Sequence, residues 1–152
     1  MSYIPTQFRL QIDNGGFMKI TLTGFALASV LLAGSAFAAA PPAIYTQAQA
    51  TAGAKVFAQN CAMCHGANLQ GMSGPTLLGQ AFASASSNYT VGAIFSEIAE
   101  QMPAGNPGSL SQDQYDEALA YILSKNGYPA GSTPVAYNAS LTSTVPLVSQ
   151  VK

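Results

Sequence analysis

The two cysteines of the chain and its only histidine stand together in the run Cys61-Ala62-Met63-Cys64-His65. Thiols and imidazoles are ligands for transition metals, iron among them. The spacing Cys-x-x-Cys-His is the signature of covalent haem attachment. In such a site two thiols add to vinyl groups on one edge of the porphyrin, and the next residue presents its imidazole to the iron. The motif predicts one covalently bound haem c, held by Cys61 and Cys64, with His65 as a metal ligand.

Three other interpretations of the motif remain open. A thioredoxin-type redox pair uses Cys-x-x-Cys in a βαβ context, whereas the surrounding sequence here is helix-like and loop-like. A structural zinc site needs four ligands, and this run offers three: Cys61, Cys64 and His65. A plain disulfide is compatible with the two cysteines but leaves the histidine without a role. Haem attachment accounts for all three residues.

Because His65 is the only histidine, a second axial ligand from this chain is not an imidazole. It is a methionine, another side chain, water or nothing. Met63 lies between the two cysteines and is tethered to the same side of the haem as His65. Met72 is only seven residues further along, whereas Met102 follows a full predicted helix and begins a loop rich in Pro and Gly. A lone methionine usually packs in the core, but the iron's need for a sixth ligand favours Met102.

The elements that must position these residues are helices. Apolar residues recur at helical spacing in three segments, two of which begin with a Ser or Thr followed three residues later by Gln, as in a capping box. The predicted helices are 46–60, 91–101 and 111–125. Residues 66–88 are rich in Gly, Ser and Asn and predict loops with one short helical turn. The apolar residues expected to surround the haem are Val56, Phe57, Leu69, Leu77, Leu78, Phe82, Ile94, Phe95, Ile98, Leu119 and Ile122.

The N-terminal segment has the pattern of an export signal. Lys19 precedes an apolar stretch that ends in the small residues of 36–40, which are the three parts of a secretory signal peptide. Met18 stands directly before Lys19, so we expect it to be the initiator. The alternative is a retained membrane anchor, since the stretch is about long enough to span a bilayer. In both cases we expect the remainder to be exported to the periplasm.

The charge of the chain excludes some partners. Only 7% of the residues are charged and the formal net charge is −1. Nucleic-acid binding requires a concentrated basic surface, so no nucleic acid is expected as a partner. No polybasic patch is present for a membrane surface, and membrane contact is expected only if the leader stays uncleaved.

From about Gln47 to Gly127 the chain resembles the class I bacterial mono-haem cytochromes c. The haem motif and Met102-Pro103 match this family in type and order. Gly53-x-x-x-Phe57 resembles its N-terminal helix, 119–123 its C-terminal helix, and Gly74-Pro75-x-Leu77 the loop after the haem motif. The resemblance implies that the carbonyl of Pro75 accepts a hydrogen bond from the axial histidine.

The segments 102–110 and 126–131 are also similar to cytochromes associated with quinoprotein alcohol dehydrogenases. The scarcity of lysines and the long uncharged tail depart from the family pattern. The resemblance implies an all-α cytochrome c-like fold, with about three to four helices around one haem. The chain then divides into an upstream extension (1–17), a signal peptide (18–39), a leader (40–46), a cytochrome c domain (47–130) and an extended C-terminal tail (131–152).

The expected function is that of a periplasmic electron carrier and not of an enzyme. Single electrons would pass from a donor dehydrogenase or reductase to an acceptor such as an oxidase. The expected redox partners are a quinoprotein dehydrogenase and a terminal oxidase. Two alternatives stay open: a fixed haem subunit of a dehydrogenase complex, with the tail as its docking segment, and a haem sensor or enzyme with a vacant distal side.

Overall fold

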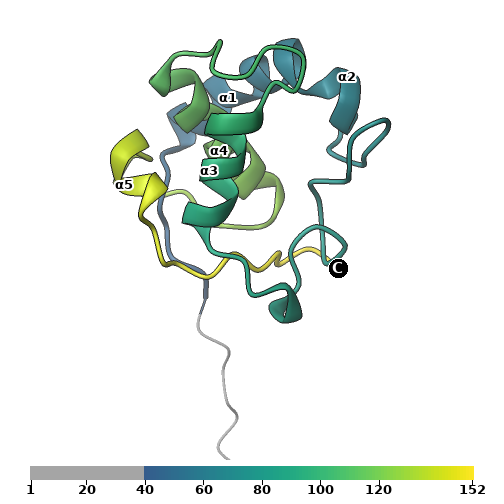
Figure 1. Ribbon diagram of the computed structural model, residues 1–152. Helices are drawn as coiled ribbons and strands as arrows, with labels where there is room; N and C mark the ends of the chain where they lie inside the picture. The colour runs from purple at the N-terminus through teal and green to yellow at the C-terminus, as the bar shows by residue number, and fades with distance from the viewer. Residues whose placement is uncertain (1–39) are drawn as a thin grey trace, which may run out of the picture. The chain divides into compact units, whose positions relative to one another are not determined.

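The computed structural model describes residues 40–152, so the predicted upstream extension and signal peptide lie outside the described residues. The described part is helical, and its only β-type pairing is an isolated bridge between Thr90 and Pro146. The helices are α1 (Gln47–Asn60), α2 (Ala62–His65), α3 (Val91–Gln101), α4 (Gln112–Lys125) and α5 (Tyr137–Leu141), with a 3-10 turn at Ala85–Ser87. Figure 1 shows their arrangement. The predicted all-α fold is confirmed.

Local sequence signals set where the two longest helices begin. Thr46 caps α1 and Ser111 caps α4. In each case the side chain of the cap residue accepts a hydrogen bond from the backbone of the third helical residue, Gln49 or Gln114, and that glutamine bonds back to the cap. These reciprocal bonds satisfy N–H groups that have no partner inside the helix. Both predicted capping boxes are present.

Helices α1 and α4 cross in close contact at Gly53. A Cβ atom built on Gly53 would lie 1.8 Å from the backbone oxygen of Glu117, so only glycine permits this approach. One turn later the Phe57 ring packs against Tyr121, with ring centroids 5.3 Å apart. Phe57, Leu69 and Ile122 form a buried cluster next to the haem motif, and Cys61 packs on it. The crossing therefore places the motif against α4.

The C-terminal segment 131–152 packs on the helical domain. Its first half contains α5, where the sequence predicted extended chain. The Tyr137 ring lies edge-on against Phe95, 5.3 Å away, and 6.3 Å from Tyr115. This tertiary packing accounts for a helix of five residues that has no side-chain cap.

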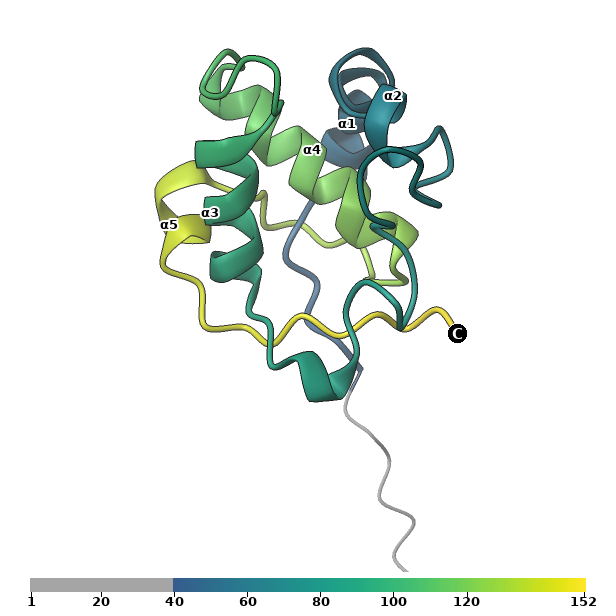
Figure 2. The ribbon, with the colours of Figure 1, turned by 45° about the vertical axis from the view of Figure 1, so that its right-hand side comes forward.

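The second half of the segment runs beneath the domain toward the C-terminus (Figure 2). The side chains of Leu147 and Ser149 are buried. The Leu147 N–H donates to the Tyr89 carbonyl and the Ser149 N–H to the Ala83 carbonyl, each at 2.8 Å. These bonds hold the loop that leads into α3. Over residues 40–152, no helix has the length and apolarity to cross a membrane.

Candidate haem site

His65 is held by a hydrogen bond that determines which of its ring nitrogens is free. It is the last residue of α2, and its side chain is buried at 8% exposure. The distance from its Nδ1 to the Pro75 carbonyl oxygen is 2.8 Å. Because a carbonyl only accepts, Nδ1 carries the proton and donates. In the neutral ring with this tautomer, Nε2 has a lone pair available for a metal, which is the arrangement expected of a histidine ligand.

The loop that carries Pro75 is fixed against the haem motif. The backbone N–H groups of Met72 and Gly74 both donate to the Cys64 carbonyl, at 3.0 and 2.9 Å. A Cβ atom on Gly74 would lie 3.0 Å from Cε1 and 3.1 Å from Nδ1 of His65. The missing side chain thus lets the loop backbone pass directly beside the imidazole.

The two cysteines are free thiols, both partly buried. Burial, and to a smaller extent the neighbouring Cys64, raises the pKa of the Cys61 thiol to about 11. A redox-active pair requires a thiol with a lowered pKa, because the thiolate is the nucleophile. The environment of Cys61 therefore disfavours the thioredoxin-type interpretation.

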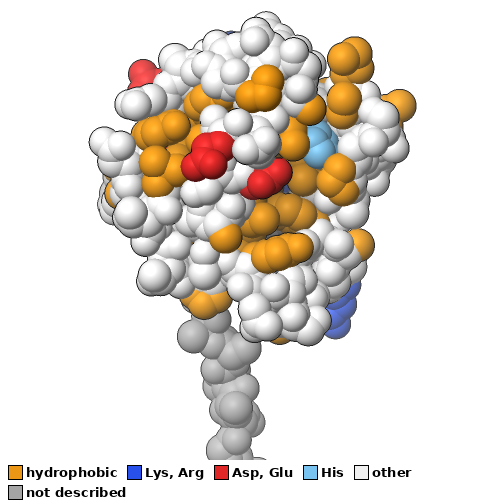
Figure 3. Space-filling view, in the orientation of Figure 1, with side chains coloured by type: hydrophobic (Ala, Val, Ile, Leu, Met, Phe, Trp, Pro, Cys, Tyr) orange, Lys and Arg blue, Asp and Glu red, His pale blue; other side chains and the backbone are white. Residues whose placement is uncertain are grey.

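A cavity of about 310 Å³ opens beside His65. The space-filling view shows the histidine on this face, with hydrophobic side chains around it (Figure 3). The cavity lies between the loop after the haem motif, helix α3 and the C-terminal end of α4. Its lining residues are His65, Pro75, Thr76, Leu77, Ala81, Phe82, Tyr89, Ile94, Glu97, Ile98, Met102 and Ile122.

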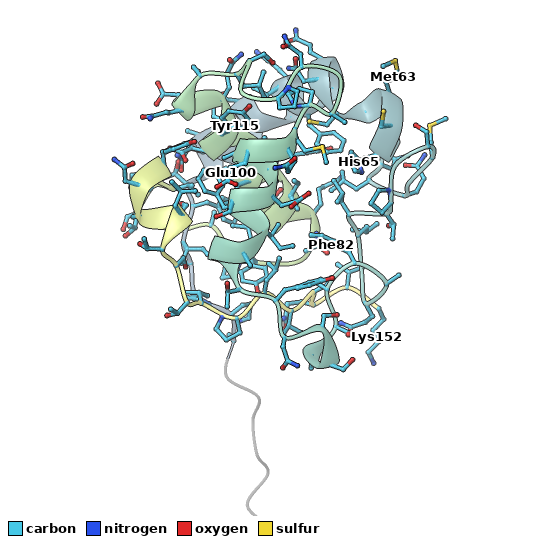
Figure 4. The ribbon with its side chains drawn as sticks, in the orientation of Figure 1. Met63, His65, Phe82, Glu100, Tyr115 and Lys152 are labelled. Atoms are coloured by element: carbon cyan, nitrogen blue, oxygen red, sulfur yellow. The ribbon has the colours of Figure 1, made fainter. Side chains whose placement is uncertain are left out.

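Met102 lines the same cavity as His65. It follows α3 directly, and its N–H donates to the Ile98 carbonyl at 3.2 Å. Its own carbonyl accepts a hydrogen bond from the Tyr115 hydroxyl at 2.8 Å. Met63 and Met72 are 86% and 70% exposed. Figure 4 shows Met63 projecting outward beyond α2. The structure thus brings His65, Pro75 and Met102 together and leaves Met63 and Met72 on the surface.

The prediction of which apolar residues surround the haem is correct in part. The predicted lining residues that face the cavity are Leu77, Phe82, Ile94, Ile98 and Ile122. Phe95 and Leu119 lie instead in the main core cluster, and Phe57 and Leu69 lie in the smaller cluster next to the haem motif. Sequence reasoning missed Tyr89 and Glu97. The signal for Glu97 was its position three residues after Ile94, on the same helix face.

Known proteins identify the family of this chain. The family described as "Cytochrome C oxidase, cbb3-type, subunit III" matches residues 48–122. The cytochrome c6 of Leptolyngbya boryana is 37% identical over 81 residues, which are 51% of this chain and 94% of that protein. This chain belongs to the class I c-type cytochromes. The sulfane dehydrogenase SoxCD of Paracoccus pantotrophus also matches, with a TM-score of 0.47 and 24% identity over 81% of this chain and 66% of that one.

As a class I c-type cytochrome, the protein binds haem c covalently and takes part in electron transfer. The residues of the haem motif and those that line the cavity fit that group, although the two cysteines are not themselves among the lining residues. Two thiols are spaced for thioether bonds, one imidazole nitrogen is free, and a methionine thioether lines the same largely apolar cavity. Thioether and imidazole are ligands that haem iron accepts.

Proposed function

We propose that this cytochrome is an exported, periplasmic carrier of single electrons whose two axial ligands are His65 and Met102. It takes electrons from a donor dehydrogenase or reductase and passes them to an acceptor such as an oxidase. When bound, the haem supplies one-electron exchange between Fe(III) and Fe(II). The observation that carries the proposal is that a histidine with a free Nε2 and a methionine line one cavity.

The residues of the chain set the properties of this site. The Pro75 carbonyl fixes the orientation of the His65 ring and increases its basicity as a ligand. The Met102 thioether would hold the haem iron together with His65, so oxygen and carbon monoxide would find no open site. A soft thioether favours the reduced metal, and an apolar lining disfavours the extra positive charge of the oxidised state. Both effects raise the reduction potential.

The surface near the haem motif supports docking by apolar contact. The exposed large hydrophobic side chains of residues 40–152 are those of Met63, Met72 and Tyr89. Met63 lies between the two cysteines, the Met72 backbone is bonded to Cys64, and Tyr89 lines the cavity. Exposed methionines adapt to different partner surfaces. This surface suits a carrier that meets a donor and an acceptor in turn.

The packing of the tail favours a mobile carrier over a fixed subunit. The proposal of a fixed subunit used the tail as a docking segment. In the structure the side chains of Val135 and Leu147 are 6% and 1% exposed, buried in the protein's own core cluster. Apolar side chains that are already buried do not contribute to a second interface.

An absorption spectrum of the purified exported protein tests the proposal. We expect sharp haem c bands in both oxidation states, a methionine–iron charge-transfer band in the oxidised state, and no shift when carbon monoxide is added to the reduced protein. A shift with carbon monoxide would mean an open distal site and would support a sensor or enzyme. Co-purification with a large dehydrogenase in fixed ratio would support the fixed subunit.

A further inference from the structure

Glu97 is the only carboxylate among the residues that line the haem cavity, and none of the others is a lysine or an arginine. The lining is otherwise apolar or neutral. A negative charge in such a place has no compensating cation beside it. Neither the covalent attachment nor the two axial ligands uses this residue, so its position needs a separate explanation.

The sequence of α3 directs Glu97 to the cavity. Ile94 and Ile98, which also line the cavity, lie three residues before and one residue after Glu97. Positions i, i+3 and i+4 share one face of a helix. Both Glu97 and Glu100 are exposed side chains of α3, but only Glu97 lines the cavity. On this face of the molecule, acidic side chains stand beside exposed hydrophobic ones (Figure 3).

We propose that Glu97 tunes the reduction potential of this cytochrome downward, an inference that rests on the proposed haem site at this cavity. Reduction adds one electron from the donor to Fe(III) and gives Fe(II), with no proton transferred. The ferric site carries one more positive charge, so a nearby carboxylate stabilises it more than the ferrous site. The Coulomb energy between two unit charges about 10 Å apart, at an effective dielectric constant of about 40, corresponds to about a fourfold change in the equilibrium constant for reduction. Glu97 thus offsets part of the rise in reduction potential that the thioether ligand and the apolar lining cause.

The test is spectroelectrochemical titration of the haem-loaded Glu97→Gln variant. We expect its equilibrium constant for reduction to rise at least threefold, which is about 28 mV at 59 mV per tenfold change for one electron. Glu97→Asp keeps the charge, and we expect it to stay within twofold of the wild type. Glu100→Gln removes the same charge from the same helix outside the cavity, and we expect a change of less than twofold.

Equal shifts in Glu97→Gln and Glu100→Gln would overturn the proposal, as would a lower potential in Glu97→Gln or a full shift in Glu97→Asp. The methionine–iron band, recorded for every variant, separates a charge effect from a displaced ligand. Absence of that band from the wild type would instead count against the proposed axial ligands. The band in the wild type therefore tests the proposed function, and the potentials of the variants test the role of Glu97.

Discussion

Each proposed axial ligand is positioned by a hydrogen bond to or from another segment of the chain. The His65 ring donates to the Pro75 carbonyl, and the Met102 carbonyl accepts from the Tyr115 hydroxyl, each at 2.8 Å. The first bond selects the tautomer of the ring. The second ties the loop after α3 to α4, so the position of the thioether depends on a tyrosine that the motif does not reveal.

Removing the Tyr115 hydroxyl should loosen the Met102 loop. We expect Tyr115→Phe to lower the free energy of unfolding by about 1 kcal/mol, since one hydrogen bond is lost. We also expect slow binding of carbon monoxide to the reduced variant, because the thioether leaves the iron more often. Tyr121→Phe removes a hydroxyl from the same helix and serves as the control. If both variants exclude carbon monoxide equally, the bond to Met102 does not position the ligand.

At the scale of elements, local signals made α1, α3 and α4 predictable. The Thr46–Gln49 and Ser111–Gln114 capping boxes mark the starts of α1 and α4, and all three helices have apolar residues at helical spacing. These signals are local in the sequence, so no tertiary information was needed. The helix α5 was missed because it depends on packing of Tyr137 against residues from other helices. The haem motif was recognisable because it too is a short continuous run of the sequence. The positions of Glu97 and Tyr89 in the cavity depend on how α3 and the loops pack.

The α1–α4 crossing should not tolerate a side chain at Gly53. Adding a methyl group 1.8 Å from the Glu117 carbonyl forces the two helices apart. We expect Gly53→Ala to lower the free energy of unfolding by about 2 kcal/mol or more. Gly105→Ala is the control, since a Cβ atom there meets nothing within 4 Å. Denaturant unfolding of the two haem-loaded variants measures both stabilities. Equal unfolding midpoints for Gly53→Ala and Gly105→Ala would refute the close contact at Gly53.

The tail should contribute to the stability of the domain. Leu147 is 1% exposed and joins the main core cluster. We expect Leu147→Ala to lower the free energy of unfolding by about 3 kcal/mol, as for other buried leucines. Val148 is half-buried, and Val148→Ala should cost less than about 1.5 kcal/mol. A Leu147→Ala protein as stable as the wild type would mean that the tail is not part of the folded core in solution.

At the scale of the whole molecule, the described part carries few charges and most of them are acidic. Its acidic residues are Glu97, Glu100, Asp113, Asp116 and Glu117, and its basic residues are Lys55, Lys125 and Lys152. With three cations against five carboxylates, the described protein part has a formal net charge of 3 − 5 = −2. Long-range electrostatic steering of a partner is therefore weak.

Association with redox partners should accordingly depend little on salt. We expect the bimolecular electron-transfer rate constant to change less than about threefold between low and high ionic strength, because screening acts mainly on steered encounters. Stopped-flow reduction by the physiological donor measures this. A steep fall with added salt would show that charged residues, and not the apolar surface around Met63 and Met72, guide docking.

One buried carboxyl should make stability depend on pH. Burial, together with the nearby charges of Asp113 and Glu117, raises the pKa of the Asp116 carboxyl to about 6, although a backbone hydrogen bond from Tyr137 lowers it in part. Its Oδ1 is buried without a hydrogen-bond partner. Because the folded pKa lies above the ordinary value of 3.8, the folded state binds the proton more tightly than the unfolded state. The stabilisation from protonation is complete below about pH 4 and is lost as the pH rises through about 6.

Thermal unfolding of the wild type and of Asp116→Asn between pH 4 and pH 7 measures this contribution. We expect the variant to gain stability relative to the wild type as the pH rises, with the difference constant above about pH 7. Glu100→Gln, which removes an exposed carboxylate on α3 that has no part in the Asp116 shift, should follow the wild-type profile. Parallel profiles for all three proteins would show that Asp116 titrates normally.

The most direct test of the account is carbon monoxide binding to the reduced haem-loaded protein after Met102→Leu substitution, compared with Met72→Leu. Both changes remove one thioether and keep a side chain of similar size, but only Met102 lines the cavity with His65. We expect Met102→Leu to bind carbon monoxide and to lose the methionine–iron band, while Met72→Leu behaves as the wild type. Carbon monoxide binding by the wild type, or an unchanged spectrum in Met102→Leu, would contradict a closed His65–Met102 electron-transfer site.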